Sequence, residues 1–252
     1  MQNYKRYLKS LLLYPEMERI SSRHVTPIWN LRRLGSSYGG WTVPANLLSE
    51  RSVCYCVGAG EDITFDLELI KRFGCEIFSY DPTPRAAAHV VLAIKNADRY
   101  HFFPIGIWDQ NETLKFYAPA DPSHVSHSVL NLQGTNAYFE AECKSLSTVF
   151  AENGHVAADL LKLDVEGAEY RILKSIVREK LQISIICVEF DELHHPLDDN
   201  AEERVATAIR ELLDFGYELI CVEACNYTFL KKTNFPYLAR AIHSVWALCR
   251  RS

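Results

Sequence analysis

The sequence lacks the signatures of a membrane protein and of a nucleic-acid binder. No stretch approaches the roughly 20 consecutive apolar residues that a transmembrane helix needs. The apolar run at residues 11–13 is short and lacks the cleavage site of a signal peptide. Basic residues occur only in pairs such as Arg32 and Arg33, and the formal net charge is −5, from 27 Lys and Arg against 32 Asp and Glu. We therefore expect neither membrane insertion nor phosphate-driven nucleic-acid binding.

The 8 cysteines also lack the spacing of a disulfide or zinc framework. No Cys-x-x-Cys pair occurs, so the usual spacing of a tetrahedral zinc site is absent. Cys54 and Cys56 alternate within one apparent strand, and Cys221 and Cys225 lie four residues apart. Free cysteine is among the most often buried residue types. We expect small buried side chains in a reduced, cytoplasmic compartment.

What the chain does have is an alternation of apolar strands and amphipathic helices. Strands are predicted over residues 52–58, 75–81, 100–108, 113–118, 141–147, 160–164, 183–190, 217–223 and 227–232. Helices are predicted over residues 63–73, 85–95 and 201–215, with another between 165 and 179. The pattern predicts an α/β domain with a mostly parallel central sheet, helices on both faces and a closing antiparallel pair of strands. Strands 100–108 and 113–118 are expected to form a hairpin.

An N-terminal helical arm, residues 1–45, is expected to precede a main domain of residues 46–252. Apolar residues recur at helical spacing near the start, and Pro27 is expected to open a second short helix over residues 28–34. The glycine-rich segment GSSYGGW, residues 35–41, is predicted to be a loop. Residues 119–140 are predicted to be a loop or lid, and residues 239–248 are amphipathic.

The first predicted strand ends in VGAGED. Ligands of such sheets bind outside the carboxyl ends of the strands, and the GAG turn of residues 58–60 lets backbone approach a ligand. A dinucleotide-binding fingerprint would place a third glycine where Ile63 stands. Glu61 and Asp62 would repel a pyrophosphate and suit a cationic ammonium or sulfonium instead. A nicotinamide-dependent oxidoreductase is therefore the least favoured alternative.

The second strand ends at Asp81, 21 residues after Gly60. A carboxylate at this distance from a glycine turn can accept hydrogen bonds from both hydroxyls of a ribose. Capping of the next helix is the alternative role for Asp81. The combination favours a cofactor that contains a nucleoside.

LKLDVEGAE, residues 161–169, supplies the third strand end. Asp164 stands at the mouth of the strand, and Glu166 follows in the turn. A hydroxyl that attacks a methyl group must lose its proton, and a carboxylate of raised pKa, a histidine or a metal ion can assist. Two close carboxylates raise each other's proton affinity. Stabilisation of the helix start explains Glu166 equally well, and Glu169 is expected to be structural.

Taken together, these segments resemble the FkbM-type methyltransferases. LKLDVEGAE is preceded by SLSTVF and followed by ICVEFDE, and VGAGED, SYDPTP and YTFLKK agree in order and spacing over roughly residues 50–232. The resemblance implies a Rossmann-like class I methyltransferase fold with S-adenosylmethionine as the methyl donor. It also implies O-methyl transfer to a hydroxyl of a sugar, a glycan or a glycosylated natural product.

The resemblance places the cofactor over the first two strand ends, with its methyl group directed towards Asp164. The candidate catalytic residues are Asp164, Glu166 and His194, a loop histidine whose ordinary pKa of about 6.5 suits a general base. The candidate cofactor-binding residues are Gly58, Ala59, Gly60, Glu61, Asp62, Asp81, Gly106, Ile107, Tyr38 and Gly39. A metal is not favoured, but Mg²⁺ would take oxygen ligands from Asp164, Glu189 and Asp191.

The expected partner is a small-molecule or glycan acceptor, bound by a monomer or a homodimer. The alternative to an enzyme is a catalytically inactive methyltransferase-like module that holds a nucleoside ligand or a protein partner. Product formation from a labelled methyl donor separates the two.

Overall fold

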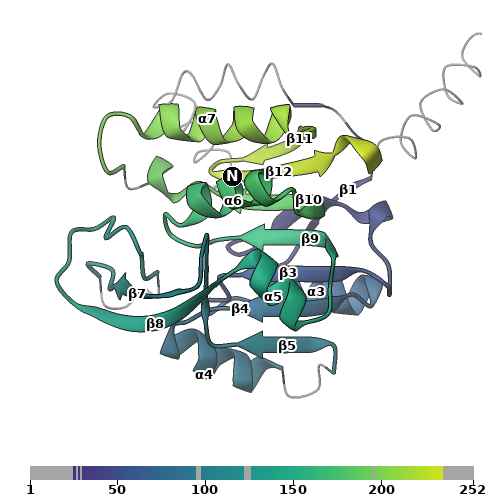
Figure 1. The fold of residues 1–252 in the computed structure, drawn as a ribbon. Helices are drawn as coiled ribbons and strands as arrows, with labels where there is room; N and C mark the ends of the chain where they lie inside the picture. The colour runs from purple at the N-terminus through teal and green to yellow at the C-terminus, as the bar shows by residue number, and fades with distance from the viewer. Residues whose placement is uncertain are drawn as a thin grey trace, which may run out of the picture.

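A seven-stranded sheet forms the centre of the structure, a computed structural model that describes residues 25–26, 28, 30–94, 98–121, 126–194 and 196–234. Figure 1 shows its strands stacked in the order β11-β12-β10-β9-β3-β4-β5. Their bounds are β3 Val53–Val57, β4 Glu76–Tyr80, β5 Tyr100–Phe103, β9 Ala157–Leu163, β10 Gln182–Glu189, β11 Tyr217–Glu223 and β12 Asn226–Lys231. Strand β12 is antiparallel to both β10 and β11, whereas β10, β9, β3, β4 and β5 pair in parallel. The predicted mostly parallel sheet with a closing antiparallel pair is confirmed.

The register of the parallel strands brings their carboxyl ends to one level. Val57 is opposite Tyr80 on one side and Leu163 on the other. Leu163 is in turn opposite Val188 of β10. The residues that follow these strands therefore share one edge of the sheet.

Two hydrophobic cores, one on each face of the sheet, explain why its central strands are largely apolar. In β9, Leu161 and Leu163 belong to one core and Leu160 to the other, as in a strand covered on both faces. The first core includes side chains of α5 (Leu146–Glu152), α6 (Glu169–Glu179) and α7 (Ala201–Asp214). The second includes side chains of α3 (Thr64–Phe73) and α4 (Pro84–Ala93).

The predicted strand over residues 100–108 is wrong, because it is two strands in different sheets. Strand β5 ends at Phe103, and β6 (Gly106–Trp108) belongs to a second sheet of order β6-β8-β7. Pro104 lies between them and has no N–H to continue a ladder.

The expected hairpin between residues 100–108 and 113–118 is also absent from these described strands. Strand β6 pairs in parallel with β8 (Tyr138–Ser145), and β7 (Glu112–Tyr117) pairs antiparallel with β8. Strand β8 begins inside the predicted loop of residues 119–140. Helix α5 follows it directly and was not predicted.

The N-terminal part of the described chain is extended, so the predicted helix over residues 28–34 is wrong. Strands β1 (Leu31–Leu34) and β2 (Trp41–Pro44) form an antiparallel pair. Leu34, Trp41 and Val43 are buried in the core beside α3, and this packing outweighs the local helical spacing. The described residues also form three short 3₁₀ helices: η1 Ala45–Leu47, η2 Asp191–Leu193 and η3 Lys232–Asn234. The remainder of the predicted arm and the stretch 239–248 lie outside the described residues.

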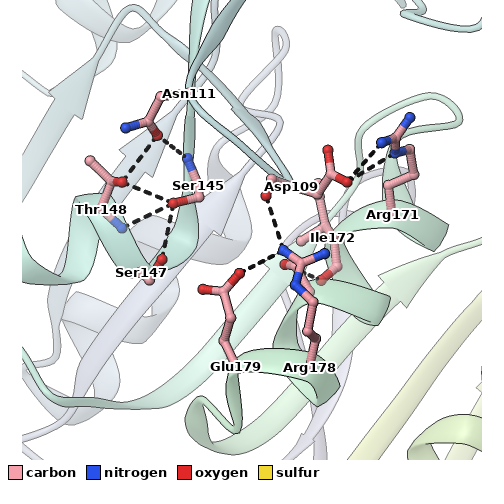
Figure 2. A network of polar contacts seen from close by, with 10 residues as sticks. Asp109, Asn111, Ser145, Ser147, Thr148, Arg171, Ile172, Arg178 and Glu179 are labelled. Carbon is pink, nitrogen blue, oxygen red and sulfur yellow. Dashed lines mark hydrogen bonds and ion pairs between the residues drawn. The ribbon is translucent and has the colours of Figure 1, made fainter.

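A polar network fastens the second sheet to the helices of the first core (Figure 2). Asn111 accepts hydrogen bonds from Ser145 N (2.9 Å) and Thr148 Oγ1 (3.0 Å), at the start of α5. Asp109 pairs with Arg171 of α6 at 2.9 Å. The turn after β6 is thereby tied to α5 and α6.

The predicted burial of the cysteines is confirmed in the part of the chain described. Seven are free; six of them are buried and Cys221 is half-buried. Among the described helices, none has the length and apolar content to cross a bilayer.

Candidate functional site

A cavity of about 1220 Å³ opens at the carboxyl edge of the parallel strands. The structure brings every predicted site residue to its lining: Tyr38, Gly39, Gly58, Ala59, Gly60, Glu61, Asp62, Asp81, Gly106, Ile107, Asp164, Glu166, Glu189, Asp191 and His194. Their individual roles remain predictions.

The glycine turn after β3 is built for close packing. Gly58 and Gly60 have left-handed φ angles of 87° and 54°. A Cβ on Gly58 would lie 1.8 Å from the carbonyl oxygen of Asp164. The turn therefore sits directly against the end of β9, and a side chain at this position has no room.

Asp81 holds the glycine turn from the neighbouring strand. It is 5% exposed. Its Oδ2 accepts a hydrogen bond from Gly60 N at 2.9 Å, and its Oδ1 accepts from Thr83 N (2.8 Å) and Thr83 Oγ1 (2.6 Å) near the start of α4. Asp81 thus has a structural role, and a carboxylate with about four acceptor sites retains capacity for a ligand hydroxyl.

Asp62 holds the loop of residues 35–40 between β1 and β2, which we call the lip loop. Its carboxylate accepts hydrogen bonds from Ser36 Oγ and from Thr64 N (3.0 Å). Burial opposes ionisation of Asp62, but the hydrogen bonds from Ser36 and Thr64 outweigh it and lower the pKa. Tyr38 stands on the lip loop and is 78% exposed.

Glu61, the other acid of the turn, forms an exposed ion pair with Arg85 at 2.9 Å. Glu61 therefore already has a cationic partner within the protein.

The turn after β9 has an unusual backbone. Glu166 and Gly167 both have left-handed φ angles, 51° and 101°. A non-glycine residue pays roughly 1–2 kcal/mol for this conformation. Three hydrogen bonds hold it in place: Glu166 N to Asp191 Oδ2 (2.9 Å), Ser128 Oγ to the Glu166 carbonyl (2.6 Å) and Gly167 N to Glu169 Oε2 (2.8 Å). Such over-determined strain is typical of functional sites.

Carboxylates crowd this part of the cavity. One oxygen each of Asp164, Glu166 and Asp191 lies within 4.8 Å of the others. Burial raises the pKa of Asp164 to about 6, against the opposing charge of Lys162, and raises the pKa of Glu166 to about 7. Burial and the neighbouring carboxylates raise the pKa of Asp191 well above its usual value. Groups that exchange protons near neutral pH are suited to acid–base chemistry.

His194 lies beside this cluster, with Nε2 3.5 Å from Glu189 Oε1. The predicted oxygen ligands for a metal were Asp164, Glu189 and Asp191, whereas the structure groups Glu166 with the two aspartates. The oxygen chemistry suits a hard divalent cation. A cluster of acids alone does not assign one, and Asp191 already accepts the Glu166 N–H.

The sequence prediction missed several lining residues. Ser126, Val129 and Gln133 reach the cavity from the predicted lid region. Ser128 is buried and bonds to the turn after β9 instead. The irregular HVSHS segment offers no periodicity from which these contacts could be inferred.

Comparisons with known proteins identify the family. A model of the methyltransferase FkbM domain matches residues 52–227, well over half of the chain. The probable methyltransferase-like protein 24 of Rattus norvegicus is 26% identical over 144 residues, which are 56% of this chain and 33% of that protein. The chain thus matches about a third of the length of this curated relative.

Solved methyltransferase structures resemble the chain only weakly. The precorrin-6y C5,15-methyltransferase of Geobacter metallireducens GS-15 has 14% identity and a TM-score of 0.41, over 73% of this chain and 83% of that chain. The fibrillarin pre-rRNA processing protein of Methanococcus jannaschii has 8% identity and a TM-score of 0.43, over 82% and 85%. The family assignment rests on the domain match rather than on these values. The predicted Rossmann-like class I fold is confirmed, and the chain belongs to the FkbM methyltransferase family.

Proposed function

We propose that the protein transfers a methyl group from S-adenosylmethionine to a hydroxyl of a sugar, a glycan or a glycosylated natural product. One observation carries the proposal: a single cavity joins the glycine turn and Asp81 to the carboxylates of raised pKa after β9. The same cavity would therefore hold the nucleoside at one end and accept the proton at the other.

The residues at the first two strand ends fit the cofactor. The turn at Gly58–Gly60 would carry backbone close to it, since a Cβ at Gly58 has no room. Asp81 already accepts three hydrogen bonds, so its carboxylate retains about one acceptor site, on Oδ2, for a ribose hydroxyl. The bound cofactor would supply an electrophilic methyl group on a sulfonium, and the acidic lining suits its positive charge.

The carboxylates after β9 would serve the acceptor hydroxyl. Asp164, with its pKa raised to about 6, is mostly ionised at neutral pH and basic enough to accept a hydrogen bond from the hydroxyl and its proton. Glu166, with its pKa raised to about 7, can exchange that proton onwards. His194 is the further candidate base at the cavity wall.

The charge of the cavity favours an acceptor without phosphate groups. Among the described residues, eight carboxylates line it: Glu61, Asp62, Asp81, Asp164, Glu166, Glu189, Asp191 and Glu223. The guanidinium in the lining belongs to Arg33, which already pairs with Glu223 at 3.1 Å. Phosphates are usually met by Arg or Lys, so a neutral hydroxyl-bearing acceptor fits this lining better than a nucleotide-linked sugar.

Calorimetry with S-adenosylhomocysteine tests the cofactor end. Asp81→Ala is expected to abolish binding while the melting temperature shows that the fold survives. Asp159→Ala is the matched control, because Asp159 also accepts a backbone N–H, from Val53 at 2.8 Å, but at the opposite end of the strands. Unchanged affinity in Asp81→Ala would contradict the assignment.

Transfer of a labelled methyl group to a panel of neutral and phosphorylated sugars tests the chemistry. Transfer to a neutral acceptor, lost in Asp164→Asn, is the expected result. Cofactor binding without transfer to any acceptor would instead favour the inactive binding module.

A further inference from the structure

Lys162 is a buried lysine directly behind the cavity wall. Its side chain, on β9, is 4% exposed. Its Nζ donates a hydrogen bond to the Gly58 carbonyl at 2.6 Å and lies 3.4 Å from Asp164 Oδ2. One ammonium group therefore touches both the glycine turn and the carboxylate at the next strand end.

Packing alone does not explain a lysine at this position. Its neighbours at the same register are Cys56 on β3 and Cys187 on β10, both small and buried. An aliphatic side chain would suit this buried position between two cysteines. Taking an ammonium out of water carries a large desolvation penalty, which only favourable charge and hydrogen-bond contacts can offset.

Two carboxylates keep Lys162 charged. Burial alone would lower its pKa, but the charges of Asp164 and Asp66 outweigh burial and raise it. Asp66 lies on α3, is 1% exposed and accepts a hydrogen bond from Tyr100 Oη at 2.9 Å. The positive charge behind the cavity wall is therefore permanent at neutral pH.

The backbone around Lys162 joins the carboxyl ends of β3 and β9 directly. Asp164 N donates to the Val57 carbonyl at 3.1 Å, and the missing Cβ of Gly58 allows the two chains to approach. The backbone bond fixes the chains but not the direction of the Asp164 carboxylate. The salt bridge to Lys162 supplies that direction.

We propose that Lys162 is a positioning residue: its ammonium group holds the Gly58 carbonyl and the Asp164 carboxylate in one fixed arrangement and so couples the cofactor turn to the reacting carboxylate. This inference rests on the proposed function. Lys162 acts through these two partners, since it is not part of the cavity lining.

The test must separate positioning from simple charge balance. Lys162→Met alone leaves Asp66 buried without its counter-charge, so it is expected to lose stability for that reason. The double variant Lys162→Met/Asp66→Asn removes both buried charges, and the amide oxygen introduced by Asp66→Asn still accepts the Tyr100 hydrogen bond. Asp66→Asn alone is the matched control.

Calorimetry with S-adenosylhomocysteine is the first readout. We expect the double variant to recover thermal stability relative to Lys162→Met, yet to bind the probe about tenfold more weakly than Asp66→Asn, the range of one lost charge-assisted hydrogen bond. Lys162→Arg, which retains charge and donors, is expected to recover most of the binding. Equal affinity of the double variant and Asp66→Asn at similar melting temperatures would overturn the proposal.

Methyl transfer is the second readout, made with an acceptor from the panel. The double variant is expected to lose about 100-fold in kcat, the scale of a misplaced reacting group, with the KM for the acceptor little changed. If the double variant does not fold, Lys162→Arg must still outperform Lys162→Gln in probe affinity, and equal affinity of these two variants would refute the inference. A wild-type protein that does not bind S-adenosylhomocysteine refutes the proposed function itself, which is a separate result.

Discussion

Glu169, the first residue of α6, offers a quantitative prediction about the stability of the site. It is 0% exposed. Its Oε2 accepts a hydrogen bond from Gly167 N at 2.8 Å, and its Oε1 has no hydrogen-bond partner in the described structure. Burial raises its pKa to about 8, and the charges of Glu166 and Glu192 add to the effect. Glu169→Gln keeps the shape and the acceptor for Gly167 but removes the ionisable group.

The raised pKa of Glu169 makes the free energy of unfolding depend on pH. The folded protein binds the Glu169 proton more tightly than the unfolded chain does. The contribution of Glu169 to the free energy of unfolding is therefore most favourable below pH 4.5 and is lost as the pH rises to about 8. Between the ordinary glutamate pKa of 4.5 and pH 7, the loss accumulates to about 3 kcal/mol at roughly 1.4 kcal/mol per pH unit. Glutamine does not titrate, so Glu169→Gln is expected to be about 3 kcal/mol more stable than wild type at pH 7 and about equal at pH 4.5.

Urea unfolding at pH steps from 4.5 to 8 measures the difference. Glu203→Gln, at an exposed position in the first turn of α7, is the control, and a change below about 0.5 kcal/mol is expected at every pH. Binding of S-adenosylhomocysteine should stay unchanged, because Glu169 is not in the cavity lining and the glutamine oxygen still accepts the Gly167 N–H that holds the turn. A gain that does not depend on pH, or a loss of stability at pH 7, would refute the reasoning.

Three further variants test other parts of the site. Gly58→Ala combines a left-handed backbone with a Cβ 1.8 Å from the Asp164 carbonyl, so calorimetry should show loss of cofactor binding; wild-type affinity would mean that the turn adapts. Arg204→Met removes the counter-charge of Glu192, whose side chain is 0% exposed. Urea unfolding should show a free energy of unfolding lower by about 2 kcal/mol, less than for a fully buried pair because Arg204 is 33% exposed. A change below about 0.5 kcal/mol would contradict this. Asp62→Ala removes the hydrogen bonds that hold the lip loop and lower the Asp62 pKa, so it should weaken probe binding and also lower the melting temperature slightly. An unchanged dissociation constant would show that the lip loop plays no part.

Elements with strong local patterns were predicted correctly. Strands β3, β4, β9 and β10 are short apolar runs bounded by polar turns, and α7 carries a clear apolar face. These patterns arise from the pleat and from the helical turn, so they can be seen in the residues themselves.

Elements that depend on distant partners were predicted wrongly. Residues 31–34 have helical spacing but form β1, because they pair with β2 and pack beside α3. Strand β6 continues an apolar run but leaves the central sheet to pair with β8, more than 30 residues away. A local pattern carries no information on which strand will be the neighbour.

The sequence by itself determined which side chains stand at the strand ends, because parallel strands must present their carboxyl ends at one edge. Gly58, Asp81 and Asp164 were located in this way. Only the tertiary structure decided how readily Asp164 takes up a proton. Asp164 and Asp191 are 27 positions apart in the chain, yet one carboxylate oxygen of Asp164 lies within 4.8 Å of one of Asp191. Burial raises the pKa of both carboxyl groups. The sequence alone gives Lys162 no special role, because its contacts form only when β3 lies beside β9. Its pKa depends on burial and on charges that only folding brings close.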